Sequence, residues 1–313
     1  MDFKQINLEI QEIEQEWKNG DEDITGATHR VKEVLENYHN SDDAVVHFKD
    51  YKVPEGFGRN HIPSNITELD ALIGGFGKGD IILISGDTGD GKSTFARFLI
   101  HKLSEQKKKS LVFSYEETNE EFISKFCGEL PDGYIPKVLT AKDPVWIEAK
   151  VLEAVELYGI EAVFIDNLKG IINYDNRRNE VSEVDSIMQK LKAIAIKYNI
   201  VLFLLAHIKK SDTGLIDKNS LTGSKTIVDT SSVGIALYRG RETQRNDEKV
   251  ITGIKYNNYT AVYLIKNRYK GKYDNFSMLF DPETGTYKPE KMPTKYKPSG
   301  NIISAEDIKR DMQ

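Results

Sequence analysis

The residues best suited to chemistry lie between Gly86 and Thr94, where the spacing is G-x-x-x-x-G-K-S. Glycines let the backbone curl so that successive N–H groups face one pocket. Lys92 can reach the β- and γ-phosphates of a nucleoside triphosphate, and the Ser93 hydroxyl can hold Mg²⁺. The segment therefore predicts a nucleoside triphosphate site made of Gly86, Asp87, Thr88, Gly89, Asp90, Gly91, Lys92, Ser93 and Thr94.

The elements on either side of this loop decide against a glycine-rich surface turn that merely contains a lysine. Residues 81–84 are four aliphatic residues in a row, which is typical of a buried strand. Phe95, Phe98, Leu99 and Ile100 follow at helical spacing. A helix that begins behind the loop adds free N–H groups and the positive end of its dipole to the phosphate pocket.

Three further strands, predicted at 110–115, 162–166 and 200–206, alternate with helices expected at 93–106, 120–130, 145–158 and 184–195. Near-continuous aliphatic strands alternating with helices indicate an α/β fold whose mostly parallel sheet is covered on both faces. The carboxyl ends of such strands face the nucleotide. Polar residues occur at these ends, namely Glu116 with Glu117, Asp166 and His207.

Each of these strand-end residues has a chemical and an ordinary interpretation. Asp166 follows four apolar residues, as expected of a carboxylate that assists Mg²⁺, although it also fits a plain strand-end aspartate. Asn167 comes next, where many ATPases have a catalytic glutamate, so the general base must come from Glu116 or Glu117. The sequence does not separate those two, and His207 is equally compatible with sensing the γ-phosphate and with a structural role.

Composition sets the limits for the whole chain. Its 313 residues suffice for one large α/β domain and an appendage. A net charge of −6 argues against a histone-like nucleic-acid binder but leaves room for a local basic channel. The single cysteine, Cys127, excludes an internal disulfide and a cysteine-based zinc site. With no apolar run of about 18 residues and no signal-peptide core, we expect a cytoplasmic protein without a membrane partner.

The periodicity predicts three regions. Residues 1–60 form a helical N-terminal arm and linker, which either docks on the main domain or a neighbouring subunit, or stays a solvated arm. Residues 61–290 form the nucleotide-binding domain, with strands at 232–238, 259–266 and 276–281 added in antiparallel fashion. Residues 291–313, rich in lysine and containing Pro293 and Pro298, form a flexible C-terminal tail.

Taken together, the motifs resemble the RecA-like P-loop core of DnaB-like hexameric replicative DNA helicases, closest to the helicase part of phage helicase–primases and mitochondrial Twinkle. The resemblance extends from about residue 62 to 289. It rests on Leu69-Asp70 with Gly74-Gly75, Gly86–Thr94, Tyr115–Thr118, Phe164–Leu168, Ala206–Lys209, Leu221–Ser224, Ala236–Arg239, Lys266–Gly271 and Phe280–Gly285.

The resemblance implies a role for each matching residue. Lys92 binds phosphate, Ser93 and Asp166 hold Mg²⁺, Glu116 is the base and His207 is the phosphate sensor. Arg268 is the arginine finger offered to the ATP of a neighbouring subunit, a contribution of about 10³–10⁵ in rate where such fingers occur. Lys266 lies beside it, Arg239 contacts the nucleotide and Phe280 stacks on the base.

For DNA, the resemblance favours the basic loop after His207, with Lys209, Lys210, Lys218 and Lys225, and as a second candidate the segment Lys169–Arg178. The resulting prediction is an ATP- and Mg²⁺-dependent helicase of the cytoplasm of a bacterium or a phage-infected cell. By its resemblance to this family, it forms a homo-oligomeric, hexameric ring that acts on single-stranded and forked DNA beside a primase or polymerase.

The alternatives are a RecA-, RadA- or KaiC-like ATPase of recombination, or a nucleotide-gated adaptor that does not unwind. Two departures from the family pattern stand out: the chain shows no primase or cysteine–zinc module, and residues 240–259 are longer and more polar than the core requires.

Overall fold

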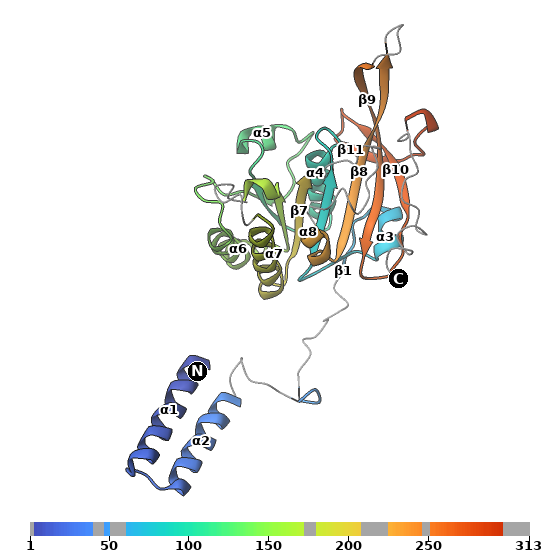
Figure 1. The fold of residues 1–313 in the computed structure, drawn as a ribbon. Coiled ribbons are helices and arrows are strands. Elements are labelled where there is room, and N and C mark those ends of the chain that lie inside the picture. Colours follow the sequence, from blue (N-terminus) through green and yellow to red (C-terminus); the bar gives the residue numbers. More distant parts are fainter. Residues whose placement is uncertain are drawn as a thin grey trace. The chain divides into compact units, whose positions relative to one another are not determined.

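A computed structural model describes residues 3–39, 47–50, 61–171, 180–207, 225–245 and 251–296. The chain divides into two compact units, one ending at Phe57 and the other beginning at Gly58 (Figure 1). The predictions for residues 209, 210, 218, 177 and 178 therefore lie outside the described residues. Among the described residues, no helix combines the length and the apolar character needed to cross a membrane.

The first unit is a helical hairpin of α1 (Phe3–Asn19) and α2 (Ile24–His39). Ile6 and Ile13 of α1 are seven residues apart and share one helix face, where they pack against Ala27 and Val34 of α2. The Asp23 carboxylate accepts hydrogen bonds from the backbone N–H groups of residues 25 and 26 at the start of α2. The predicted helical arm is thus a hairpin with a small apolar seam of its own.

The second unit is built on a sheet of nine strands within the described part of the chain, in the order β11-β10-β9-β8-β3-β7-β6-β4-β5. The strands β8, β3, β7, β6, β4 and β5 run parallel, and β9, β10 and β11 continue the sheet in antiparallel fashion. The strands are β3 (Ile81–Gly86), β4 (Ser110–Ser114), β5 (Gly133–Tyr134), β6 (Ala162–Asp166), β7 (Val201–His207), β8 (Val233–Arg245), β9 (Ile251–Asn267), β10 (Asn275–Asp281) and β11 (Thr286–Pro289).

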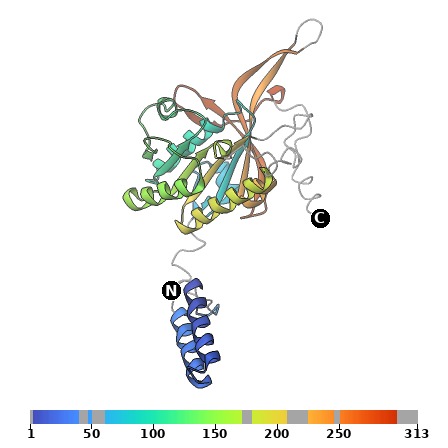
Figure 2. The same cartoon turned by 60° about the vertical axis from the view of Figure 1, so that its left-hand side comes forward.

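Successive residues of β3 point to opposite faces of the sheet, and each face has its own apolar core. Ile82 and Ile84 pack with α4 (Lys92–Ser104) on one face. Ile81 and Leu83 pack with α6 (Pro144–Tyr158) and α7 (Glu180–Lys197) on the other, and Figure 2 shows these two helices side by side. All six β3 residues are buried, which explains why this strand is aliphatic over most of its length.

Short elements complete the second unit. They are β1 (His61–Ile62), α3 (Thr67–Ile73), β2 (Phe76–Gly77), α5 (Asn119–Ser124), η1 (Leu168–Gly170), α8 (Lys225–Thr230) and η2 (Thr294–Tyr296). The helix predicted at 120–130 is shorter than expected. Its start is fixed by a capping box between Thr118 and Glu121, but Gly128 adopts a φ of 76° and the chain turns away before Pro131.

The C-terminal strands differ from prediction in two ways. The strand predicted at 232–238 is not an antiparallel addition, because β8 pairs parallel with β3; the antiparallel strands begin at β9. In addition, β8 and β9 are much longer than predicted and project as a hairpin beyond the neighbouring strands (Figure 1). The polar stretch 240–259 forms much of this hairpin, whose residues pair with each other rather than with β3.

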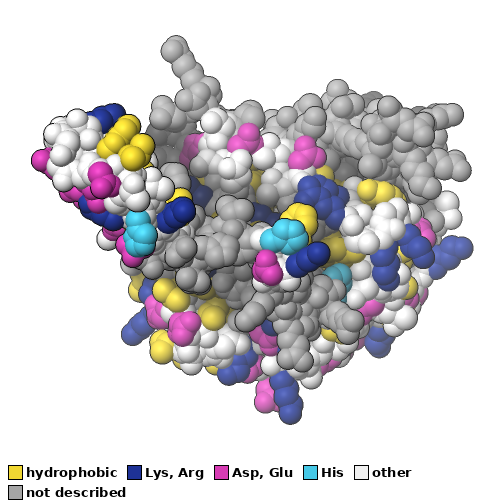
Figure 3. Space-filling model, turned by 90° about the horizontal axis from the view of Figure 1, so that it is seen from below, with side chains coloured by type: hydrophobic (Ala, Val, Ile, Leu, Met, Phe, Trp, Pro, Cys, Tyr) yellow, Lys and Arg dark blue, Asp and Glu magenta, His cyan; other side chains and the backbone are white. Residues whose placement is uncertain are grey.

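Of the predicted tail, residues 291–296 are described and pack on the sheet. Met292 is buried, its N–H donates to the Ser277 hydroxyl, and Tyr296 stacks on Tyr259. Figure 3 shows one face of the molecule, where lysine and arginine side chains are interspersed with aspartate and glutamate. This mixture fits the modest net charge of −6.

Candidate nucleotide site at the strand ends

The phosphate-loop segment connects the end of β3 at Gly86 to the start of α4 at Lys92. Gly89 and Gly91 have φ values of 83° and 88°, a region that side chains with a Cβ rarely adopt. Gly91 is the residue immediately before α4, so the loop delivers the chain directly into the helix N-terminus. This is the strand–loop–helix context that the sequence predicted, with the free N–H groups of a helix start behind the loop.

Lys92 is buried, with 5% of its surface exposed, and lies at the centre of the site. Its ammonium group donates to the carbonyl oxygens of Gly86 (3.2 Å) and Asp87 (3.1 Å) and lies 3.2 Å from Nδ1 of His207. Burial lowers the pKa of Lys92, while the carboxylates of Glu116 and Asp166 oppose that shift. The amine is therefore held beside the loop by carbonyl groups, which a phosphate can replace as partners.

Strand register brings the polar strand ends together. Gly86 of β3 lies opposite His207 of β7, and Asp166 of β6 pairs with Leu205 of β7 and with Ser114 of β4. The chain leaves β4 with hydrogen bonds from the N–H groups of residues 115 and 116 to the Asp166 carbonyl oxygen. Four side chains from separate segments, those of Lys92, Glu116, Asp166 and His207, thus share one edge of the sheet.

Glu116 and Glu117, which the sequence could not separate, have different surroundings. Glu116 accepts a hydrogen bond from the Asn167 amide (2.9 Å) and lies 3.4 Å from Nε2 of His207. Glu117 instead pairs with Arg97 (2.9 Å) and Lys125. Burial raises the pKa of Glu116, but the Asn167 hydrogen bond and the charges of His207 and Lys92 bring it below its ordinary value. Glu116 is therefore the ionised carboxylate that faces the phosphate lysine.

Asp166 is 1% exposed, and neither carboxylate oxygen has a hydrogen-bond partner of regular geometry among the described residues. Burial raises the pKa of Asp166 to about 6; the Ser93 hydroxyl opposes the increase, and the Glu116 and Glu117 carboxylates add to it. Oxygen ligands of this kind suit Mg²⁺, which usually keeps waters and substrate phosphates as its other ligands. The described residues hold no cluster of three or more His, Cys, Asp or Glu, which agrees with a metal completed by the nucleotide.

His207 lies between the phosphate lysine and the candidate base. Its two ring nitrogens face Lys92 and Glu116, at 3.2 Å and 3.4 Å. Burial and the neighbouring Lys92 charge lower the pKa of His207, and Glu116 opposes that shift. A neutral imidazole in this place connects the two groups, so a change at one is transmitted to the other.

Arg268 and Lys266 lie at the opposite end of the sheet from the phosphate loop. The Arg268 N–H donates to the Ser232 carbonyl, and the Ser232 N–H donates to the carbonyl of Ile81 at the start of β3. From Ile81 to Gly86 the strand covers about 16 Å at the usual rise per residue. Both side chains donate to backbone carbonyls at the end of α8, those of residues 228 and 229. Burial and Arg268 lower the pKa of Lys266 to about 8.

The two residues predicted to contact the nucleoside are on the loop side of the sheet. The Arg239 Nε donates to the Asn257 carbonyl oxygen (2.7 Å), and the guanidinium lies 5.5 Å from the Tyr256 ring centre. Phe280 packs against Tyr287, which in turn packs against Phe95 of α4. A Cβ at Gly91 would lie 3.6 Å from the Tyr287 hydroxyl, so Tyr287, rather than Phe280, is the aromatic residue against the loop.

Comparisons with known proteins agree on the fold. Residues 62–128 match the family described as ATPase: KaiC. A solved helicase ATPase domain superposes with a TM-score of 0.61 at 17% identity, covering 84% of this chain and 98% of that one. A DnaB-like replicative helicase, solved in a study of its interactions with primase, superposes with a TM-score of 0.59 at 18% identity over 91% and 75% of the two chains.

The fold is that of a RecA-type P-loop ATPase. DNA repair proteins RadA share this sequence signal over about half of the chain: the protein from Listeria monocytogenes is 27% identical over 157 residues, and that from Campylobacter jejuni is 27% identical over 149. These matches cover 48% and 46% of this chain and 32% of each RadA protein, so the ATPase spans about a third of the length of these relatives.

The structure adds neighbours to the ATPase site that the sequence did not single out. Asn167 was noted only for not being glutamate, yet it binds Glu116. Arg97 holds Glu117 away, and Tyr256 and Arg241 reach the loop from the β8–β9 hairpin. The length and polarity of residues 240–259 were the only signal for the hairpin residues.

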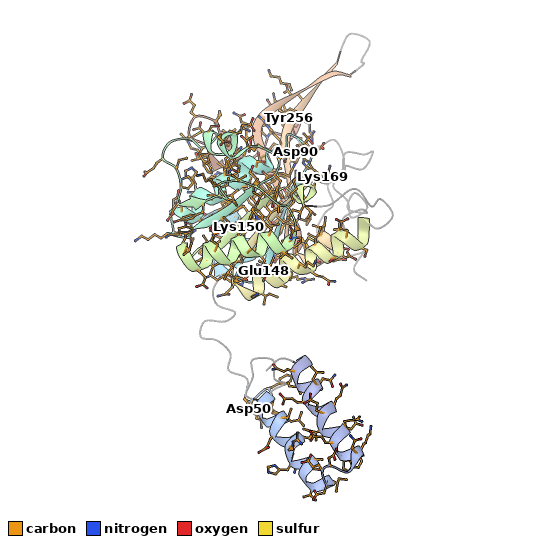
Figure 4. All side chains as sticks on the ribbon, turned by 90° about the vertical axis from the view of Figure 1, so that its left-hand side faces the viewer. Asp50, Asp90, Glu148, Lys150, Lys169 and Tyr256 are labelled. Carbon is orange, nitrogen blue, oxygen red and sulfur yellow. The ribbon has the colours of Figure 1, made fainter. Side chains whose placement is uncertain are left out.

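The residues predicted to bind DNA are the least defined. Lys209, Lys210 and Lys218 lie outside the described residues. Lys225 begins α8, and Lys169 of η1 is exposed on the nucleotide side of the sheet (Figure 4).

Proposed function

We propose that this ATPase is a ring-forming motor that uses ATP and Mg²⁺ to move on single-stranded DNA and unwind duplex DNA, with a hexamer as its working form. The observation that carries the proposal is the division of the hydrolytic groups. Lys92, Glu116, Asp166 and His207 share one edge of the sheet, while Arg268 lies at the other. Because Arg268 cannot reach its own phosphate loop, a finger role requires a neighbouring subunit.

Within one subunit, each side chain has a task that its surroundings support. Lys92 binds the β- and γ-phosphates, and Ser93 and Asp166 hold Mg²⁺, which neutralises phosphate charge when it is bound. Glu116, ionised and hydrogen-bonded to Asn167, polarises the attacking water. His207 contacts both Lys92 and Glu116 and so registers whether a γ-phosphate is present.

The DNA contacts of the proposal come from the basic residues after His207 and from Lys169. Positive side chains on such segments bind the phosphate backbone without regard to sequence. Single-stranded and forked DNA are the proposed substrates. A primase or polymerase is the proposed partner, since the DnaB-like helicase of similar fold interacts with primase. A bacterial or phage-infected cytoplasm is the proposed setting.

The decisive experiment compares ATPase rates with and without single-stranded DNA, together with unwinding of a fork, for the wild type and Lys92→Ala. We expect DNA-stimulated hydrolysis and unwinding in the wild type and neither in the variant. Mixing Lys92→Ala with Arg268→Ala subunits adds a test of the shared site, because a mixed ring contains seams with an intact loop beside an intact finger. Hydrolysis restored by mixing supports the shared site, and no recovery at any ratio contradicts it.

A second function is a RadA-like ATPase of recombination, favoured by the RadA matches over about half of the chain. Electron microscopy with ATP separates closed rings from filaments on DNA. A nucleotide-gated adaptor is distinguished by Glu116→Gln: an adaptor keeps its biological activity with bound ATP, whereas a motor loses unwinding.

A further inference from the structure

The phosphate loop contains an aspartate, Asp90, whose side chain is fully buried beside the phosphate-binding backbone. Its carboxylate accepts hydrogen bonds from the N–H groups of Asp87 (3.0 Å) and Arg239 (3.3 Å). The first bond closes the loop on itself, and the second ties the loop to β8. Asp90 therefore sets the shape of the loop, but it also places a negative charge within a site meant for a triphosphate.

The compensating charge comes from Arg241, about 150 residues away in the sequence. One guanidinium nitrogen lies 3.5 Å from Oδ1 of Asp90, and the Arg241 side chain is 13% exposed. The guanidinium is 4.6 Å from the ring centre of Tyr238 and 5.6 Å from that of Tyr256. Two aromatic faces thus hold the cation in place, which favours a fixed orientation over a loose surface ion pair.

The same hairpin also packs against the loop backbone. A Cβ at Gly89 would lie 3.6 Å from the Tyr256 hydroxyl, and one at Gly86 would lie 2.9 Å from the Leu237 carbonyl oxygen. Figure 4 shows Asp90 and Tyr256 at the end of the sheet where the hairpin leaves it. The loop is therefore supported from outside by β8 and β9, and not only by its own strand and helix.

We propose that Arg241 is a positioning residue for ATP binding: it neutralises Asp90 and so holds the phosphate loop in its binding shape. This inference rests on the binding of ATP at the loop, which is part of the proposed function, and not on DNA unwinding. Without Arg241, the carboxylate of Asp90 would be buried, uncompensated and close to the triphosphate, a costly arrangement. The consequence is weaker binding, with little effect on the chemistry of the ATP that does bind.

The test measures the dissociation constant for a fluorescent ATP analogue with Mg²⁺, and kcat and KM for ATP, in variants of the full chain. We expect Arg241→Gln to weaken binding by at least about tenfold, equivalent to roughly 1.4 kcal/mol, and to raise KM while kcat stays near wild type. Asp90→Asn keeps the hydrogen-bonding shape without the charge and should bind within about threefold of wild type.

The double variant Arg241→Gln with Asp90→Asn decides whether the carboxylate is the reason. It should recover binding to within about threefold of Asp90→Asn alone, because no charge then needs compensation. Arg241→Lys restores the charge without the planar group and should be intermediate. Lys255→Gln is the matched control, since it removes an exposed positive charge from β9 of the same hairpin and should bind ATP like the wild type.

Thermal unfolding without nucleotide identifies a purely structural role. If Arg241→Gln lowers the melting temperature but leaves the dissociation constant unchanged, Arg241 supports the fold and the inference is wrong. A double variant as weak as Arg241→Gln would also overturn it, because the defect would not act through Asp90. Should Arg241→Gln fail to fold, Arg241→Lys and the double variant still give these outcomes. Loss of unwinding with normal ATP binding would count against the motor and not against Arg241.

Discussion

Two buried or half-buried aspartates at opposite ends of the sheet show how the same side chain serves structure in one place and chemistry in the other. Asp80, just before β3, is bonded to Lys192 (2.7 Å), the Tyr269 hydroxyl (2.9 Å) and the Ser232 hydroxyl. Asp166, at the end of β6, has no regular hydrogen-bond partner for either oxygen among the described residues. A satisfied carboxylate stabilises the fold, whereas an unsatisfied one keeps its oxygens available to a ligand.

The pKa values follow the same division. Burial raises the pKa of Asp80, but its bonds to Lys192 and Ser232 bring it below the ordinary value. Burial raises the pKa of Asp166 to about 6, and the opposing contact with Ser93 does not reverse it. The nucleotide end of the sheet is therefore built at a cost in stability, while the opposite end supplies stability. Mutations should separate the two ends.

The largest expected effect is on hydrolysis at the nucleotide end. Glu116→Gln should lower kcat about 10²–10⁴-fold while ATP binding persists, because the general base is lost but the phosphate contacts remain. Steady-state hydrolysis and analogue binding measure the two quantities. Glu117→Gln is the matched control: its carboxylate pairs with Arg97 and Lys125, so kcat should fall far less. Equal losses in both variants would contradict the assignment of Glu116.

The next effect contrasts the two aspartates in the free energy of unfolding. Asp80→Asn should destabilise the protein by about 1–3 kcal/mol, since it weakens a bonded network whose partners stay buried. Asp166→Asn should be neutral or stabilising without Mg²⁺, because it removes a poorly compensated buried charge, yet it should abolish Mg²⁺-dependent hydrolysis. Urea unfolding of both variants is the measurement, and the comparison breaks if Asp166→Asn is the more destabilising.

The pH dependence of stability should have opposite signs at the two ends. The folded pKa of Asp166, about 6, lies above its ordinary 3.8, so the folded state holds more protons between these values. Its contribution therefore falls as pH rises from about 4 to 6, and Asp166→Asn should remove that fall in Mg²⁺-free protein. For Asp80, whose pKa is below 3.8, the contribution is present above pH 3.8 and is lost as pH falls further. Unfolding midpoints of both variants from about pH 3 to pH 7 would show it.

The smallest effect belongs to neither end. Lys150 pairs with Glu153 on the exposed face of α6 (Figure 4), at 35% and 49% exposure. Lys150→Gln should change the free energy of unfolding by less than about 0.5 kcal/mol and leave hydrolysis unchanged. A larger loss would mean that surface charges support the sheet more than the aspartate comparison allows.

Much of the nucleotide site could be predicted because local signals place it. The aliphatic strands end in Glu116, Asp166 and His207, and parallel strands put their carboxyl ends at one edge. The β8–β9 hairpin was not predicted, since a polar stretch such as 240–259 has no local signal that distinguishes a long paired hairpin from a loop. The parallel pairing of β8 with β3 was missed for a related reason: strand partners depend on contacts distant in sequence.

By itself, the sequence determined the strand–loop–helix that binds phosphate, the two-faced sheet and the identity of the groups at its edge. These follow from periodicity, glycine positions and residue chemistry, which are local. Only the tertiary structure decided which glutamate faces Lys92, that Asp166 lacks regular partners among the described residues, that Arg241 reaches Asp90, and that Arg268 lies about 16 Å of strand away from the loop. Those facts depend on register and packing between distant segments, where each side chain's energy is set by neighbours the local sequence does not name.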